Sequence, residues 1–246
     1  SSTNAAKACI TNGGVLAWGS TSFGGNVDNV VTNSTNMTSG MVSLFRNQQA
    51  FSALKDDGNL YSWGAPTNGG TAPAAMTSVT SVASSYKAFA AVNGTGTDNI
   101  KAWGASADGG DTSTPVDATT ALSTFTATAV YGNLHAFVAV DASGDVVTWG
   151  ASASGGSAGS PTGSNGTDTL TNISTVVGSD QAFAAIRTGG SLVTWGAAAY
   201  GGSLSTPNNV LSDINTALTT NGLTIVNIYS TLKAFAALFD DGSVIA

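Results

Sequence analysis

One histidine and one cysteine are the side chains best suited to catalysis or metal binding in this sequence, and each stands alone. His135 could act as a general base, but no second histidine and no Ser-His-Asp grouping accompanies it. Cys9 has no second cysteine for an internal disulfide, and the two residues are too few for a zinc site. We therefore predict no catalytic residue, no metal site and no cofactor, with His135 at a strand edge and Cys9 a buried, inert thiol.

Two other patterns could bind ions, and both have a simpler reading as turns. The carboxylates of Asp56-Asp57-Gly58 and Asp240-Asp241-Gly242 could offer oxygens to calcium, but that ion takes about six to eight. Hairpin turns fit better, because glycine adopts positive φ at low cost. Gly-Gly pairs are reminiscent of phosphate-binding loops, yet none precedes an expected helix. We expect these glycines to form tight turns.

The amino-acid composition argues against a disordered chain, a nucleic-acid-binding protein and a membrane protein. The chain has 246 residues, of which 42% are hydrophobic and only 9% charged, with 7 basic and 14 acidic residues and a net charge of −7. A core can form, so disorder is excluded. The negative charge disfavours binding to nucleic acid or to an anionic membrane surface. No apolar run is long enough for membrane insertion.

A repeat of Trp-Gly-x4-Gly-Gly accounts for all five tryptophans. Successive tryptophans lie 45, 40, 46 and 46 residues apart, a period typical of propeller blades. The copies are Trp18-Gly19 with Gly24-Gly25, Trp63-Gly64 with Gly69-Gly70, Trp103-Gly104 with Gly109-Gly110, Trp149-Gly150 with Gly155-Gly156, and Trp195-Gly196 with Gly201-Gly202.

A hairpin is expected before each tryptophan, and a further apolar run precedes most of these hairpins. The clearest hairpin joins Ala50–Leu54 to Asn59–Trp63, and partial copies lie at 6–18 and 234–246. No segment has a helical period long enough to predict a helix. The predicted fold class is therefore all-β, a β-propeller of about 45-residue blades. Stacked blades bury strand faces that would be exposed to solvent in a single blade. An open β-solenoid is the alternative.

The repeated string, seen as Ala-Phe-Ala-Ala-Leu-x-Asp-Asp-Gly at 234–242, resembles the repeat of the regulator-of-chromosome-condensation family of β-propellers. It is closer still to a degenerate secreted form found in large bacterial and protist surface proteins. A family histidine before the hairpin strand has only His135 as its match; the other copies carry Gln49, Lys87, Gln181 and Lys233. No loop matches those used for nucleotide exchange or nucleosome binding, so the resemblance implies the fold and not those activities.

The expected organisation is one propeller domain, 1–246, with five to six blades. Its units are approximately 6–49, 50–87, 88–135, 136–181 and 182–233, followed by a half unit at 234–246. The ring could close with the first and last strands sharing one sheet. Alternatively, the missing strand could come from another chain or from flanking sequence, since an open strand edge accepts an added strand.

We therefore expect a non-catalytic, extracellular or cell-surface module, structural or adhesive, that self-assembles or belongs to a larger surface protein or filament. The start at Ser1 in place of methionine indicates a processed or excised product. Protein partners are expected, and Asn33 and Asn36 are acceptor sites for possible glycans. The alternative is a secreted protein-binding propeller, inhibitor-like or receptor-like, acting through loops of one face.

Overall fold

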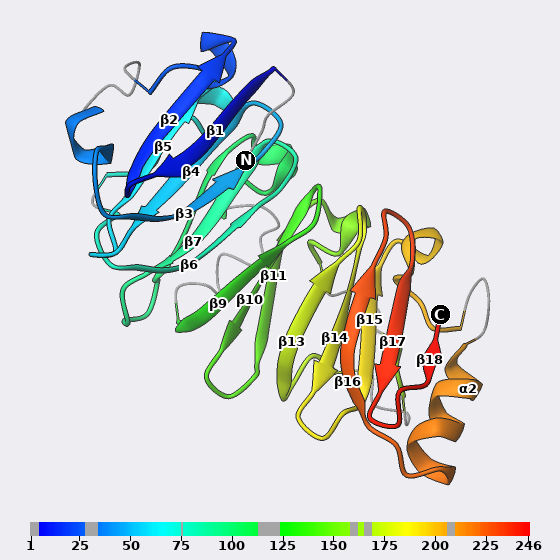
Figure 1. The fold of residues 1–246 in the computed structure, drawn as a ribbon. Coiled ribbons are helices and arrows are strands. Elements are labelled where there is room, and N and C mark those ends of the chain that lie inside the picture. Colours follow the sequence, from blue (N-terminus) through cyan, green and yellow to red (C-terminus); the bar gives the residue numbers. More distant parts are fainter. Residues whose placement is uncertain are drawn as a thin grey trace. The chain divides into compact units, whose positions relative to one another are not determined.

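The computed structural model describes residues 5–27, 34–74, 76–112, 124–157, 162–164, 169–205 and 210–246. The chain divides into two compact units, Ser1–Val130 and Tyr131–Ala246. In both units, antiparallel sheets of mostly three strands alternate with short turns (Figure 1). The expected all-β propeller class is confirmed.

The first unit contains three sheets. Each sheet after the first joins an apolar run to the hairpin that follows it, and the order of strands in the sheet is the order in the chain. The sheets consist of β1 (Ala6–Thr11) and β2 (Gly14–Gly19); β3 (Met41–Arg46), β4 (Ala50–Lys55) and β5 (Leu60–Gly64); and β6 (Val79–Ser84), β7 (Ala88–Asn93) and β8 (Ile100–Gly104).

The second unit repeats this plan, and the division between the units falls within β9. A two-residue strand, β12, adds to the edge of its middle sheet. The sheets consist of β9 (Ala127–Gly132), β10 (Ala136–Asp141) and β11 (Val146–Gly150); β12 (Thr162–Gly163), β13 (Ile173–Gly178), β14 (Ala182–Arg187) and β15 (Leu192–Gly196); and β16 (Ile225–Ser230), β17 (Phe235–Phe239) and β18 (Val244–Ile245).

A helix before the last sheet departs from the expectation of a helix-free chain. Helix α2 (Leu211–Asn215) continues into a π-helical turn, η9 (Thr216–Thr220). Ile214 and Ala217 are buried in a cluster with Ile225 and Ile228 of β16, so the segment covers this sheet with one apolar side (Figure 1). Tertiary burial of that side stabilises a helix that is too short to be stable alone. All helices among the described residues are too short to span a membrane.

The core lies between successive sheets of each unit. In the first unit, Phe51 and Trp63 pack against Ala6, Ala8 and Val15 of the sheet before them. In the second, Phe183 and Trp195 pack against Ala136, Val138 and Val140 in the same way. Stacking of sheets therefore buries both faces of an interior sheet, as a propeller requires.

The Gly-Gly pairs form the expected tight turns. In the copy that follows β5, a 3₁₀ turn, η4 (Pro66–Asn68), ends at Gly69, whose φ is 95°. The Gly70 amide nitrogen then donates a hydrogen bond to the Ala65 carbonyl at 2.8 Å. The turns after β2, β8, β11 and β15 have the same form.

Candidate functional site

A stacked pair of aromatic rings marks the same place in four sheets. The residue opposite each buried tryptophan is a phenylalanine on the neighbouring strand, and the ring centroids lie 5.3–5.6 Å apart. The pairs are Phe51–Trp63, Phe89–Trp103, Phe137–Trp149 and Phe183–Trp195. All eight side chains are buried, which supports the prediction that these tryptophans anchor the packing.

In three sheets, the indole nitrogen donates a hydrogen bond to the sheet before it. Trp63 Nε1 donates to the Gly24 carbonyl at 2.9 Å, and Trp103 Nε1 donates to the Gly69 carbonyl at 3.1 Å. Trp195 Nε1 makes the same bond to Gly155 at 3.2 Å. In these three copies, the first glycine of the pair is therefore both a turn residue and the acceptor for the next indole.

Trp18 is the exception, and the prediction that all five tryptophans are equivalent is wrong for it. Trp18 as a residue is 52% exposed, and Leu16 on the same strand face is 56% exposed. Lys7 stands opposite Trp18 where the other sheets have phenylalanine. Cys9, beside them on this face, is a free, half-buried thiol. The expectation of a buried thiol is therefore wrong, because no described sheet precedes β1 and covers this face.

His135 lies at the strand edge as expected, half-buried just before β10. Its backbone nitrogen donates to Asn133 Oδ1 at 2.9 Å, and its carbonyl accepts from the Ala151 amide at 2.9 Å. The carbonyls of Gln49, Lys87 and Gln181 accept equivalent bonds. The structural role of this position thus belongs to the backbone, which explains why several side chains fill it.

The Asp-Gly turns use their carboxylates as hydrogen-bond acceptors. Asp57 Oδ1 accepts from the Asn59 amide at 3.0 Å, and this bond lowers the pKa of Asp57. The bond from the Thr224 hydroxyl, 2.8 Å long, lowers the pKa of Asp240. Within the described ranges, no three His, Cys, Asp or Glu side chains gather in a group that could hold a metal.

We predict that EDTA leaves the melting temperature unchanged to within about 1 °C, because the turn carboxylates already have protein partners. Differential scanning calorimetry with and without EDTA, followed by added calcium, tests this expectation. A fall of several degrees that calcium reverses would restore calcium binding as the role of these turns.

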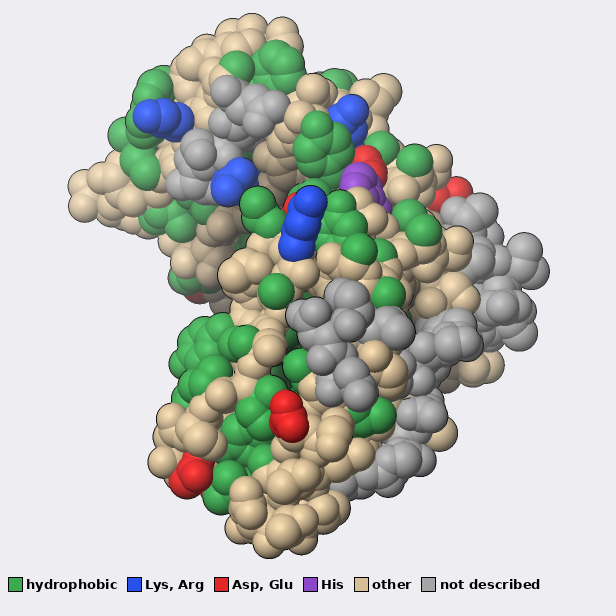
Figure 2. Space-filling model, turned by 90° about the vertical axis from the view of Figure 1, so that its right-hand side faces the viewer, with side chains coloured by type: hydrophobic (Ala, Val, Ile, Leu, Met, Phe, Trp, Pro, Cys, Tyr) green, Lys and Arg blue, Asp and Glu red, His purple; other side chains and the backbone are tan. Residues whose placement is uncertain are grey.

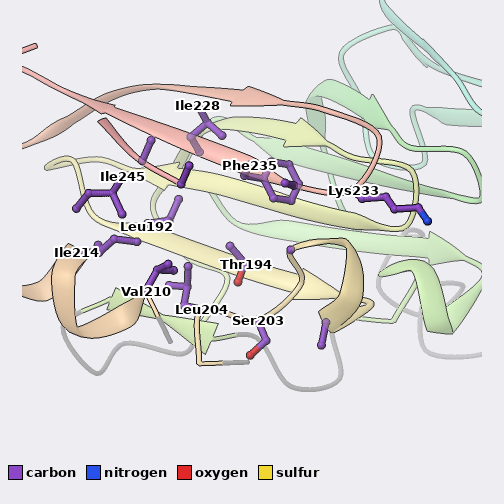
Figure 3. A pocket seen from close by; sticks show the side chains of 15 residues that line it. Leu192, Thr194, Ser203, Leu204, Val210, Ile214, Ile228, Lys233, Phe235 and Ile245 are labelled. Atoms are coloured by element: carbon purple, nitrogen blue, oxygen red, sulfur yellow. The ribbon is translucent and has the colours of Figure 1, made fainter. Parts of the chain in front are cut away.

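A cavity of about 140 Å³ lies between the sheet of β15 and the last sheet. Phe235, Ile228 and Ile245 line one side, and Leu192 and Thr194 of β15 line the other (Figure 3). Leu204, Val210 and Ile214 close one end, so most of the lining is apolar. The sequence analysis did not predict this cavity, because the cavity depends on packing between two sheets.

The last sheet carries several exposed apolar side chains. The sequence analysis did not predict them. Val226, Tyr229 and Val244 are all more than half exposed, and so is Leu232 in the turn between β16 and β17. Figure 2, which views the molecule from the right-hand side of Figure 1, shows hydrophobic side chains reaching the surface among polar and charged ones. An uncovered apolar surface of this kind favours protein contacts.

Of the two expected glycan sites, Asn36 is half-buried in a 3₁₀ turn, η3 (Ser34–Met37). Asn33 lies outside the described residues. Glycosylation stays a prediction at both positions.

No protein-family model matches this sequence, and no curated protein matches it. Similar solved structures include human WBSCR16 (18% identity, 79% of this chain, 60% of that chain, TM-score 0.48). Yeast RCC1 (Prp20), solved bound to Kap60, is similar as well (17% identity, 79% and 54%, TM-score 0.49). So is the ectodomain of the Physcomitrella patens receptor kinase CR4 (11% identity, 97% and 60%, TM-score 0.49). This chain spans 54–60% of their lengths, and the similarity to RCC1-like propeller repeats expected from the sequence is found among these structures.

Proposed function

We propose that this chain is a non-catalytic structural or adhesive module of the cell surface or extracellular space that associates with copies of itself. The observation that carries the proposal is a pair of uncovered apolar sheet faces, one on the first sheet and one on the last. Low charge and abundant hydroxyl side chains support a role in extended protein contacts.

The uncovered face of the first sheet carries Lys7, Cys9, Leu16 and Trp18. By register, Lys7 and Trp18 correspond to Phe51 and Trp63 of the next sheet. In that sheet this face is buried against the sheet before it. The first sheet therefore presents a face of the type that packs onto a preceding sheet.

The uncovered face of the last sheet corresponds to the face that, in earlier sheets, is covered by the following sheet. Leu238 pairs with Val244, in the register position of Leu54 and Leu60. Leu60 is 5% exposed because the next sheet, carrying Phe89, covers it, whereas Val244 is 58% exposed. Inside the fold, a face like that of the first sheet packs against a face like that of the last sheet. Contact between the first sheet of one copy and the last sheet of another would be heterologous and could repeat into chains.

Sedimentation velocity over a concentration series tests this proposal. We expect concentration-dependent oligomers that Trp18→Asp and Val244→Asp each shift to monomers, because a buried unpaired carboxylate opposes the contact. Val42→Asp is the matched control, since Val42 is 57% exposed but lies on β3, away from both faces.

Two results would contradict self-association: a monomer at every concentration, or an equal response of all three variants. A monomer that binds one protein ligand tightly would favour the alternative, a protein-binding propeller. Electron microscopy of the oligomers would show whether they are ordered filaments.

A further inference from the structure

The tripeptide Thr-Asn-Gly occurs three times, at Thr11-Asn12-Gly13, Thr67-Asn68-Gly69 and Thr220-Asn221-Gly222. Asparagine before glycine is prone to spontaneous loss of its side-chain amide, because glycine has no β-carbon to hinder ring closure. The backbone nitrogen of the glycine attacks the asparagine Cγ, the new N–C bond closes a succinimide ring, and the side-chain amide leaves as ammonia. Since the three local sequences are the same, the fold decides which copy reacts.

At Asn68 both reacting groups are held by hydrogen bonds. The side-chain nitrogen of Asn68 donates to Gln49 Oε1, and the Gly69 nitrogen donates to the Pro66 carbonyl at 3.3 Å. Gly69 is also buried, and an added side-chain carbon there would lie 2.6 Å from the Phe89 ring. The attack would have to break both hydrogen bonds and turn a peptide unit that is packed against this ring, so the second copy is protected.

At Asn12 the peptide unit is fixed by a hairpin. Asn12 and Gly13 form the two-residue turn between β1 and β2, and the pairing of Thr11 with Gly14 fixes both ends of this turn. The Gly13 carbonyl also accepts a hydrogen bond from the Met41 nitrogen at 2.8 Å, which ties the turn to the next sheet. Asn12 is exposed, but rotation of its peptide unit toward the side chain would disrupt these contacts.

At Asn221 neither reacting group is held. Asn221 and Gly222 are both exposed, and they directly follow the helical segment of α2 and η9. Among the described residues, the structure gives no hydrogen-bond partner for the Gly222 nitrogen or for the Asn221 side-chain amide. An added side-chain carbon at Gly222 would meet nothing within 4 Å, so this peptide unit has room to turn.

Gly222 also ends the helical segment. Its φ is 67°, and the Leu223 nitrogen beyond it donates to the Ala217 carbonyl at 3.0 Å, in the pattern of a glycine cap at a helix C-terminus. Ala217 is one of the buried residues through which the segment packs on the last sheet. Isoaspartate adds one carbon atom to the backbone, and either product of deamidation adds a negative charge where the helix dipole is already negative. Both changes weaken this cap.

From these observations we propose that Asn221 is a site of spontaneous deamidation, and that its conversion loosens the helical segment 211–220. Water opens the succinimide at either carbonyl, which leaves aspartate or isoaspartate at this position. The rate rises with pH, because the attacking nitrogen must lose its proton. The reaction does not depend on self-association, since it needs only water and atoms of this chain.

Peptide mapping by tandem mass spectrometry, after incubation at mildly alkaline pH, compares the three copies within one molecule. We expect Asn221 to convert at least about tenfold faster than Asn12 and Asn68, because a hydrogen bond that must first be broken slows the attack. In urea, where the fold is lost, the three asparagines should convert at nearly equal rates. Equal rates in the folded chain would overturn the proposal, and so would the same order of rates in urea.

Hydrogen exchange measures the effect on the helical segment. After ageing, amides of residues 211–220 in the unmodified chain should exchange at least about threefold faster than before. Asn221→Gln keeps the amide but lengthens the side chain by one methylene, which makes ring closure much slower, so ageing should leave its exchange unchanged. Asn68→Gln is the matched control and should age like the unmodified chain. If the aged chain carries isoaspartate or aspartate at 221 and exchange is unaltered, the proposed loosening is wrong.

Discussion

Replacement of Trp103 by alanine is expected to lower the free energy of unfolding by about 3–5 kcal/mol, the range for emptying a buried aromatic site. Trp103 stacks on Phe89 at 5.6 Å, and its indole nitrogen bonds the Gly69 carbonyl. Its loss leaves a cavity between two sheets and a carbonyl without that donor. Urea unfolding followed by circular dichroism measures the change.

Trp18→Ala provides the matched control in the same unit. Because Trp18 is half-exposed and faces no described sheet, its removal should cost less than about 1 kcal/mol in the monomer. If Trp103→Ala melted like the unmodified chain, the buried tryptophans would not be packing anchors.

Gly64→Ala is expected to be as damaging, at about 3–5 kcal/mol, although it adds only a methyl group. The φ of Gly64 is 112°, and an added side-chain carbon would lie 2.6 Å from the Gln49 carbonyl oxygen and 2.8 Å from the Ala50 α-carbon. These are backbone atoms of the paired strand, so relief requires opening the sheet beside Trp63. Thermal and urea unfolding of the variant measure the loss.

Gly94→Ala separates backbone strain from the clash. Gly94 also has positive φ, at 89°, but an added carbon would meet nothing within 4 Å. Its cost should be that of the conformation alone, about 1–2 kcal/mol. Equal losses at Gly64 and Gly94 would show that close approach of the strands has little effect.

The sequence predicted the repeated parts of the fold well, because each signal occurs several times. The hairpin around Gly58, the run before it and the turn at Gly69-Gly70 lie where the repeat placed them. Periodic spacing and turn chemistry are local properties, and they agree with the packing between sheets.

The features that occur once were harder to predict. The helical turns around Ile214 follow a short period of apolar residues that spans less than three turns, too little to distinguish from a loop. Exposure of Trp18 and Cys9 depends on which sheet faces have a neighbour, and the cavity at Phe235 depends on how the last two sheets pack together. That information lies in tertiary packing, so the candidate site could not be located from spacing alone.

The bonds from the indoles of Trp63, Trp103 and Trp195 to glycine carbonyls of the preceding sheets have a consequence for the order of unfolding. Within a unit, such links couple a sheet only to its neighbours, as in a one-dimensional array. In the described structure the outer face of the first sheet is exposed at Trp18, whereas Phe51 of β4 is fully buried, so amide protons of β1 should exchange with solvent before those of β4. Hairpins that are packed on both faces should then be the last to open.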